Sequence, residues 1–302
     1  GSVMVPITVI RNGAGPTALL TGANHGDEYE GVIALLDLAA TLSPDAVRSD
    51  TMRGRIIILP ALHSPAFRAG TRTSPIDRGN MNRIFPGKPD GTVTQQIADY
   101  VQRVLIPMAD AALDMHSGGK TLDFLPLAAA HLLEDKTQEA ACIAAMQAFC
   151  APYSLKMLEM DAVGMLDTAV EEAGKLFVTT ELGGGGTTPA RSNAIAKRGL
   201  RNFLIHVGVL QGEIEHSPST LLNMPDDQCF HKSLDSGLVE PMVDLGDGVL
   251  AGDLLARIWP VDRTGVQPVL YHAQRDGIVM ARHFPGLIGV GDCLAVVAEI
   301  VP

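Results

Sequence analysis

The sequence has few basic residues and no long apolar run. Its 23 Lys and Arg residues are outnumbered by 34 Asp and Glu residues, which gives a formal net charge of −11. A chain with this charge repels phosphate backbones, so we expect no nucleic-acid partner. No uninterrupted apolar run approaches the roughly 18 residues of a membrane span, so we expect no membrane partner either.

Cysteine is also scarce. The four cysteines are scattered and form no CxxC pair; they are Cys142, Cys150, Cys229 and Cys293. In a chain of 302 residues this usage is typical of reduced thiols in a cytoplasm. The first residues lack the basic segment and apolar stretch of a secretory signal. We therefore predict a cytoplasmic globular protein.

Short apolar runs alternate with helical patterns through the first two-thirds of the chain. Strands are predicted over residues 5–11, 17–21, 55–62, 111–115 and 176–180, and helices over residues 29–42, 94–105, 137–150 and 193–210. This alternation predicts a layered α/β domain over residues 1–225. Ligands are expected beyond the carboxyl ends of its strands.

The pattern changes after about residue 225. Gly and Asp recur at turn positions between short apolar runs, which predicts a small all-β module over residues 226–302. The phrases at residues 248–256 and 289–295 repeat each other and resemble the half-barrels of lipoyl- and biotinyl-carrier domains. No Lys stands in the hairpin near residues 276–279, where the carrier lysine would be. We therefore expect a structural module or a lid, without an attached cofactor.

His25 and Glu28 stand three residues apart where a predicted strand meets a predicted helix. Residues three apart in a helical turn lie on one face, so this imidazole and this carboxylate can hold one ion. Zinc accepts such a pair together with one further histidine, and leaves a fourth position for water. For the pair alone, a solvated helix start that favours acids is the alternative.

His116 is the candidate for the third ligand. It ends another predicted strand in front of a Gly-rich loop, and of the nine histidines only His25 and His116 stand at such a junction. Asp114 lies two residues earlier on the same side of the strand. It can hydrogen-bond a ligand imidazole and fix its tautomer. We predict one zinc ion per chain.

Glu181 ends a buried strand and is followed by four glycines over residues 183–186. The glycines permit tight backbone geometry and leave space around the carboxylate. They do not form a phosphate loop, because no Gly-Lys-Ser/Thr follows. A Glu beside water on a metal can take its proton and pass it to a leaving amine. We prefer this general-base role for Glu181 over that of a solvated loop acid.

Residues 72–83 concentrate arginine in an otherwise acidic chain. They include Arg72, Arg78 and Arg83, together with Asn82. An Arg side chain offers parallel donors that match a carboxylate, and a neighbouring Asn adds another donor. The cluster therefore suits a small anionic group, with an ordinary surface loop as the alternative.

At these four clusters the chain resembles the succinylglutamate desuccinylase/aspartoacylase family, relatives of the zinc carboxypeptidases. The motifs occur in the order of the family, as His25 with Glu28, Asn82 with Arg83, Asp114 with His116, and then Glu181. The resemblance implies a mixed, largely parallel sheet sandwiched by helices. It also implies that zinc and its water hydrolyse the amide of a small N-acyl amino acid, with Glu181 as base and then acid.

The resemblance further implies roles for the arginine cluster. Asn82 and Arg83 would hold the carboxylate of the amino acid, and an upstream Arg would polarise the scissile carbonyl. Arg72 matches the family spacing better than Arg78, which stands closer to Asn82. Tyr271 is the candidate for a tyrosine that the family contributes from its C-terminal module.

Residues 69–77 and 116–124 look closest to bacterial enzymes that deacetylate N-acetyl-L-2,4-diaminobutyrate during ectoine breakdown. We therefore expect this activity. The ammonium group of such a substrate needs an acid, and the candidates are Asp123, Asp167, Glu171 and Glu172. The alternatives are an aspartoacylase- or succinylglutamate desuccinylase-type deacylase, a metallocarboxypeptidase, and a relict hydrolase scaffold that only binds. A homo-oligomer is plausible, without a predicted order.

Overall fold

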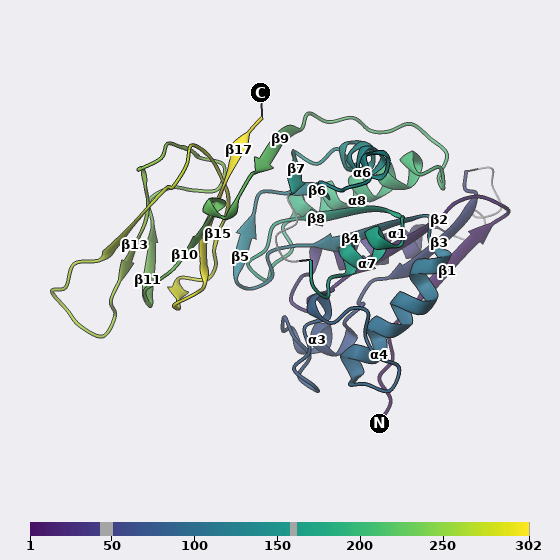
Figure 1. The fold of residues 1–302 in the computed structure, drawn as a ribbon, viewed down its shortest axis with the longest axis horizontal. Helices are drawn as coiled ribbons and strands as arrows, with labels where there is room; N and C mark the ends of the chain where they lie inside the picture. Colours follow the sequence, from purple (N-terminus) through teal and green to yellow (C-terminus); the bar gives the residue numbers. More distant parts are fainter. Residues whose placement is uncertain (43–50, 158–161, 302) are drawn as a thin grey trace.

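The computed structural model describes residues 1–42, 51–157 and 162–301. Figure 1 shows an α/β body, in which helices flank a central sheet, and a β-rich module that extends from one end of this body. The predicted fold class is confirmed. Within the described ranges, no helix is long and apolar enough to cross a membrane.

The central sheet has the order β1-β3-β2-β4-β8-β6-β7-β9 and continues through β17, β15 and β12. Its first eight strands are β1 Thr8–Asn12, β2 Thr17–Gly22, β3 Gly54–Leu59, β4 Ala111–His116, β6 Leu127–His131, β7 Tyr153–Met157, β8 Leu176–Glu181 and β9 Thr220–Met224. Strands β3, β2, β4 and β8 are parallel, and β6, β7 and β9 are parallel to one another. Only the β1–β3 and β6–β8 pairs are antiparallel among these eight described strands, so this part is mixed and largely parallel.

The register of the parallel strands brings the predicted site segments to one edge of the sheet. Every residue of β2 and β4 is buried. Gly22 at the end of β2 pairs with Met115, and His116 at the end of β4 pairs with Glu181 at the end of β8. Because parallel strands end at the same edge, the loops that follow β2, β4 and β8 lie side by side.

Helices cover both faces of this sheet. One layer contains α1 Glu30–Thr41, α6 Lys136–Phe149 and α8 Ala190–His206, and the other contains α4 Val93–Tyr100, α5 Ile106–Met108 and α7 Leu166–Glu172. Two separate apolar cores lie between the helices and the two faces, one around Phe149 and Phe203 and the other around Leu105 and Leu166. In Figure 1, α6 and α8 lie above the sheet and α4 lies below it. Burial on both faces explains the continuous apolar runs of the strands.

The C-terminal module joins the central sheet and adds a second sheet of its own. The joined strands are β10 Phe230–Lys232, β12 Gly248–Val249, β15 Gly277–His283 and β17 Cys293–Ile300, and the second sheet has the order β14 Val269–His272, β13 Leu254–Trp259, β11 Gly237–Pro241, β16 Leu287–Ile288. Strand β9 pairs with β7 on one side and with β17 on the other. The central sheet therefore continues past residue 225. The boundary at this point and the likeness to a carrier half-barrel stay predictions.

The two repeated phrases of the module form the same kind of turn. In the first, β12 leads into β13, and in the second, β16 leads into β17. The carboxylate of Asp253 accepts a hydrogen bond from the Leu250 N–H at 2.8 Å, and that of Asp292 accepts one from the Gly289 N–H at 2.8 Å. The repeat thus encodes a turn in which an aspartate fixes the backbone between a short strand and a long one.

Several predicted elements have other bounds in the structure; the strand predicted over residues 5–11 begins at Thr8, and the helix predicted over residues 193–210 ends at His206. The strand predicted over residues 55–62 ends at Leu59, because the Leu62 N–H turns back to the carbonyl oxygen at the end of β2. The helix predicted over residues 94–105 is α-helical only to Tyr100 and continues as a π-helix.

Some short elements were not predicted. Strands β5 (Leu122–Phe124), β6 and β7 contain three to five residues each, and α7 contains seven. Such lengths give too few repeats of a periodic pattern to separate a strand from a loop. These elements matter for function, because β5 pairs with β15 of the C-terminal module and α7 carries one side of the cavity described below.

Candidate active site

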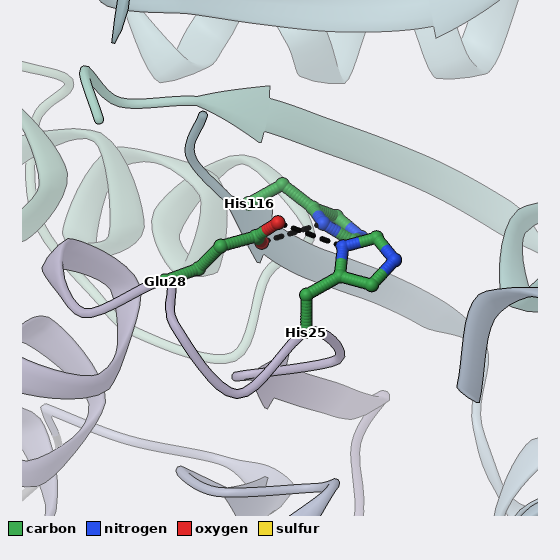
Figure 2. Close-up of side chains that lie close together, drawn as sticks. All are labelled: His25, Glu28 and His116. Atoms are coloured by element: carbon green, nitrogen blue, oxygen red, sulfur yellow. Dashed lines mark hydrogen bonds and ion pairs between the residues drawn. The ribbon is translucent and has the colours of Figure 1, made fainter. Parts of the chain in front are cut away.

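His25, Glu28 and His116 point toward one another (Figure 2). Oε1 of Glu28 lies 2.7 Å from Nδ1 of His25, and Oε2 of the same carboxylate lies 2.8 Å from Nδ1 of His116. All three residues are buried. One potential ligand atom from each lies within 4.8 Å of the others, so these residues could hold a single metal ion. The three ligands predicted from two distant segments do come together.

The loop between β2 and α1 presents His25 and Glu28 on the same side. The Glu28 N–H bonds to the His25 carbonyl oxygen at 3.4 Å, which closes a turn between them. Gly26 allows this turn to lie against helix α3 (Ser64–Ala69). A Cβ at this glycine would lie 2.0 Å from the carbonyl carbon of Ala66, so any side chain would displace the loop.

Asp114 orients His116. Its Oδ2 lies 2.8 Å from Nε2 of His116, which leaves Nδ1 of the ring to face Glu28. Asp114 is itself held by Oγ1 of Thr21 at 2.6 Å and by Nδ2 of Asn24 at 2.8 Å. A ligand histidine bonded in this way has a fixed ring plane and a fixed tautomer.

The electrostatics of Glu28 and His25 fit a divalent cation, whereas the raised pKa of His116 means that this ring must release its proton when an ion binds. Burial alone would raise the pKa of Glu28, but the facing imidazoles of His116 and His25 outweigh it and hold that pKa well below its usual range. Burial lowers the pKa of His25, whereas at His116 the carboxylates of Asp114 and Glu28 outweigh burial and raise the pKa. An ionised carboxylate and a neutral imidazole are the states that ligation requires. Two histidines and one Glu form a donor set that zinc accepts.

Glu181 lies next to His116 across the β4–β8 pair. Its Oε2 is buried and has no hydrogen-bond partner among the residues that the structure describes. Burial, reinforced by the negative charge of Glu28, raises the pKa of Glu181 to about 8. A carboxylate with a raised pKa beside a cation site is a candidate for proton transfer near neutral pH.

The glycines after Glu181 allow the loop to approach β5 closely. Gly184 has a φ of +152°, and a Cβ there would lie 2.1 Å from the carbonyl oxygen of Leu122. Residues that have a side chain rarely adopt this backbone conformation. The tight geometry predicted for residues 183–186 is therefore present.

Glu30 is a second buried carboxylate near Glu181, and the sequence did not single it out. It is fully buried, and burial raises its pKa to about 7. Its negative charge also contributes to the raised pKa of Glu181. An acid in the first turn of a helix is ordinary, so its local sequence contains no signal of this burial.

Arg72, and not Arg78, reaches the site. Nη1 of Arg72 lies 3.7 Å from Oε1 of Glu28, and its side chain lines the cavity beside the three ligands. Arg78 lies in a turn in which its N–H bonds to the Ser74 carbonyl oxygen, and it does not line this cavity. The family spacing thus selected the arginine that the fold places next to the ligands.

Asn82 and Arg83 line the same cavity. Oδ1 of Asn82 accepts hydrogen bonds from Nδ2 of Asn24 at 3.2 Å and from the Leu166 N–H at 3.0 Å. This leaves its Nδ2 group to donate. Nη1 of Arg83 donates to the carbonyl oxygen of Asn82 at 2.6 Å and lies 2.8 Å from Sδ of Met165. Asn82 is therefore anchored between the loop after β2 and the start of α7, and Arg83 is held against Asn82 and Met165.

The cavity has a volume of about 620 Å³. The α/β domain contributes the predicted ligands, Glu181 and the acid Asp167. The C-terminal module contributes His283, Asp292 and Cys293. The module thus forms one wall of the site. No residue of this wall was predicted as a site residue; Asp292 and Cys293 lie in the second repeated phrase, which encodes a turn and contains no signal of a ligand site.

The suggestion that Tyr271 enters the site is wrong. Its hydroxyl donates to Oδ2 of Asp235 at 2.7 Å and accepts from the Leu234 N–H at 2.8 Å, and the residue does not line the cavity. Tyr271 lies on β14 in the second sheet of the module. It stabilises a turn there, away from the ligands.

Comparisons with known proteins show the family of the chain. A family model described as the succinylglutamate desuccinylase/aspartoacylase catalytic domain matches residues 14–207. The chain is 52% identical over 303 aligned residues to the N-alpha-acetyl-L-2,4-diaminobutyric acid deacetylase of Halomonas elongata, and the match covers 100% of this chain and 87% of the relative.

Solved structures share the whole fold. The product-bound structure of the ectoine utilization protein EutE (DoeB) from Ruegeria pomeroyi is 66% identical with a TM-score of 0.95, over 99% of this chain and 90% of the other. A succinylglutamate desuccinylase from Silicibacter species TM1040 is 64% identical with a TM-score of 0.96, over 100% of this chain and 90% of the other.

Proposed function

Because the chain belongs to the succinylglutamate desuccinylase/aspartoacylase family, we propose that it hydrolyses N-acetyl-L-2,4-diaminobutyrate to acetate and L-2,4-diaminobutyrate, a step of ectoine breakdown. The relative from Halomonas elongata supports this substrate. One observation carries the reaction class: a candidate His–Glu–His cation site lies beside the half-buried Glu181, whose carboxyl has a raised pKa. That combination is suited to hydrolysis of an amide.

We propose that the cofactor is one zinc ion per chain, held by His25, Glu28 and His116. Zinc bound there supplies a Lewis acid for the acyl carbonyl and for the attacking water. Asp114 maintains the ring of His116 in the orientation that ligation needs, because it accepts the hydrogen bond from Nε2.

Glu181 is the proposed proton carrier. It takes a proton from the water as the oxygen bonds to the acyl carbon, and it delivers this proton to the amide nitrogen as the C–N bond breaks. The raised pKa of about 8 means that the carboxyl can hold the proton between the two steps. We expect Arg72 to donate to the carbonyl oxygen as negative charge develops on it, and its position 3.7 Å from Glu28 supports this role.

Asn82 and Arg83 are the proposed binding group for the substrate carboxylate. The Nδ2 group of Asn82 is left to donate, because Oδ1 of the same amide is engaged by Asn24 and Leu166. Arg83 is exposed at the cavity wall and adds a positive charge next to it. Together they offer a charge-assisted pair of donors for one carboxylate.

The test is a substrate comparison on the purified enzyme. N-acetyl-L-2,4-diaminobutyrate, N-acetylaspartate and succinylglutamate are assayed side by side, before and after chelation and after zinc is restored. We expect the fastest turnover with the diaminobutyrate amide, loss of activity on chelation, and recovery with zinc. Faster turnover of N-acetylaspartate or succinylglutamate would contradict the proposed substrate, but the proposed reaction class, amide hydrolysis, would stand.

Two further outcomes separate the remaining alternatives. Shortening of peptides in a ladder assay would identify a metallocarboxypeptidase. Binding of these amides without zinc-dependent turnover would identify a scaffold that only binds. The cytoplasmic location and a homo-oligomeric state stay predictions. The four cysteines are free in the structure, which supports the predicted location.

A further inference from the structure

Four acids were left open as partners of a substrate ammonium, and the fold separates them. Asp167 lines the cavity, whereas Asp123, Glu171 and Glu172 do not. Glu172 is exposed on α7, and Asp123 lies on β5 opposite Arg282 of β15. Among the candidates, only Asp167 can therefore meet a substrate in this cavity.

Asp167 lies beside the group proposed to bind the substrate carboxylate. The Leu166 N–H, one residue earlier in the chain, donates to Oδ1 of Asn82 at 3.0 Å. Nη1 of Arg83 lies 2.8 Å from Sδ of Met165, two residues before Asp167. Donors for an anion and an acceptor for a cation thus share one stretch of the cavity wall.

This spacing suits one particular kind of molecule. Asp167 directly follows Leu166, whose N–H contacts Asn82, and successive Cα atoms lie about 3.8 Å apart, so Asn82 and Asp167 occupy neighbouring positions of the cavity wall. In L-2,4-diaminobutyrate, two methylene groups separate the α-carbon from the ammonium, which places the ammonium roughly 4–6 Å from the carboxylate. An amino acid with a short cationic side chain can bridge the two groups.

The surroundings of Asp167 favour a strong charge pair. The residue is 7% exposed, so a cation that reaches it leaves most of its water behind. Oδ2 of Asp167 lies 4.0 Å from Nε2 of His131, and Nδ1 of that ring lies 2.9 Å from Oε1 of Glu171. The buried His131 therefore lies between two carboxylates, and Oδ1 of Asp167 accepts a hydrogen bond from the Thr168 N–H at 2.6 Å, which fixes its position. A fixed, buried carboxylate binds a cation more strongly than a solvated one.

We propose that Asp167 binds the side-chain ammonium of the substrate and makes the enzyme selective for N-acetyl amino acids with a short cationic side chain. The proposal rests on the deacetylase function proposed above. Asp167 contacts the part of the substrate that does not react. Removal of the Asp167 charge should therefore reduce the preference for a cationic side chain and leave the hydrolysis of a neutral substrate unaffected.

The experiment compares two substrates of equal backbone. N-acetyl-L-2,4-diaminobutyrate has the ammonium, and N-acetyl-L-2-aminobutyrate lacks it. Asp167→Asn keeps the size of the side chain and removes its charge. We expect kcat/KM for the diaminobutyrate amide to fall about 30-fold, as is typical for loss of a hydrogen bond to a charged group, while kcat/KM for the neutral amide stays within about 3-fold. Asp167→Glu should retain part of the preference.

Glu172→Gln is the matched control, because it removes the same charge from an exposed position on the same helix. It should leave both values unchanged. An equal fall of kcat/KM for both substrates in Asp167→Asn would show a structural role and overturn the proposal. An unchanged preference for the diaminobutyrate amide would overturn it as well.

The failure of the proposed function gives a different result. If the wild-type enzyme prefers N-acetylaspartate to both amides, the deacetylase substrate is wrong and the ammonium subsite falls with it. If the wild type prefers the diaminobutyrate amide and Asp167→Asn retains this preference, the function stands and only the role of Asp167 is wrong.

Discussion

Oδ2 of Asp114 lies 2.8 Å from Nε2 of His116, two residues further along β4. The other nitrogen of the same ring lies 2.8 Å from Glu28, which comes from the loop after β2. The imidazole is therefore held between two buried carboxylates, one from β4 and one from the loop after β2. Its Nδ1 atom is directed to the cation site before any ion binds.

Asp114→Asn should weaken zinc binding about 10- to 100-fold, because the ring of His116 loses the acceptor that fixes its tautomer. Competition with a zinc chelator measures this change. Asp110→Asn is the control, since Asp110 precedes β4 at its opposite end and accepts from the Thr17 N–H. Equal weakening in both variants would mean that the strand, and not the ring contact, is responsible.

Glu181→Ala should retain one zinc ion per chain and lose activity by a factor of about 10²–10⁴ in kcat, the usual contribution of a general base. Metal analysis and steady-state kinetics on the same preparation measure both. His25→Ala should instead lose metal and activity together. An active Glu181→Ala enzyme would assign the proton transfer to another group.

Arg72→Met should reduce kcat more than it raises KM, because the guanidinium is expected to stabilise charge that develops only in the transition state. A loss on the order of 10²-fold is expected, similar to loss of one oxyanion donor. Arg78→Met removes the same charge from a turn outside the cavity and should have little effect. A larger loss of kcat in the Arg78 variant would assign the stabilisation of the carbonyl oxygen to Arg78.

The pH dependence of stability offers a test of the environment of Glu181 without substrate. In the metal-free protein, burial and the charge of Glu28 raise the pKa of Glu181 from 4.5 to about 8. Between these values the folded state holds a proton that the unfolded chain has released, so the contribution of Glu181 to stability falls as the pH rises. Glu181→Gln should therefore have a higher Tm than the wild type, and the difference should grow from about pH 5 to about pH 8.

Thermal unfolding of chelated wild-type and Glu181→Gln protein at several pH values measures this difference. Saturation with zinc should reduce it, because a nearby cation favours the ionised carboxyl. A difference that does not change with pH would place the pKa of Glu181 near its ordinary value.

The cation site was predictable because its information is local. His25, Glu28, His116 and Glu181 stand at the ends of apolar runs, and the ends of parallel strands meet at one edge of a sheet. Residue type, strand periodicity and the order of the motifs were sufficient to bring them together. The partner of His116 was predictable for the same reason, since Asp114 lies two residues away on one side of a strand.

The sequence by itself thus determined the α/β class, the candidate ligands and the family of the chain. The tertiary structure agreed with the choice of Arg72 over Arg78, and it alone placed Asp167 in the cavity among the four acids, placed Tyr271 away from the candidate ligands and made the C-terminal module a wall of the cavity. These outcomes depend on how α7 and the module pack against the sheet. Such packing follows from contacts between distant segments, which no local periodicity encodes.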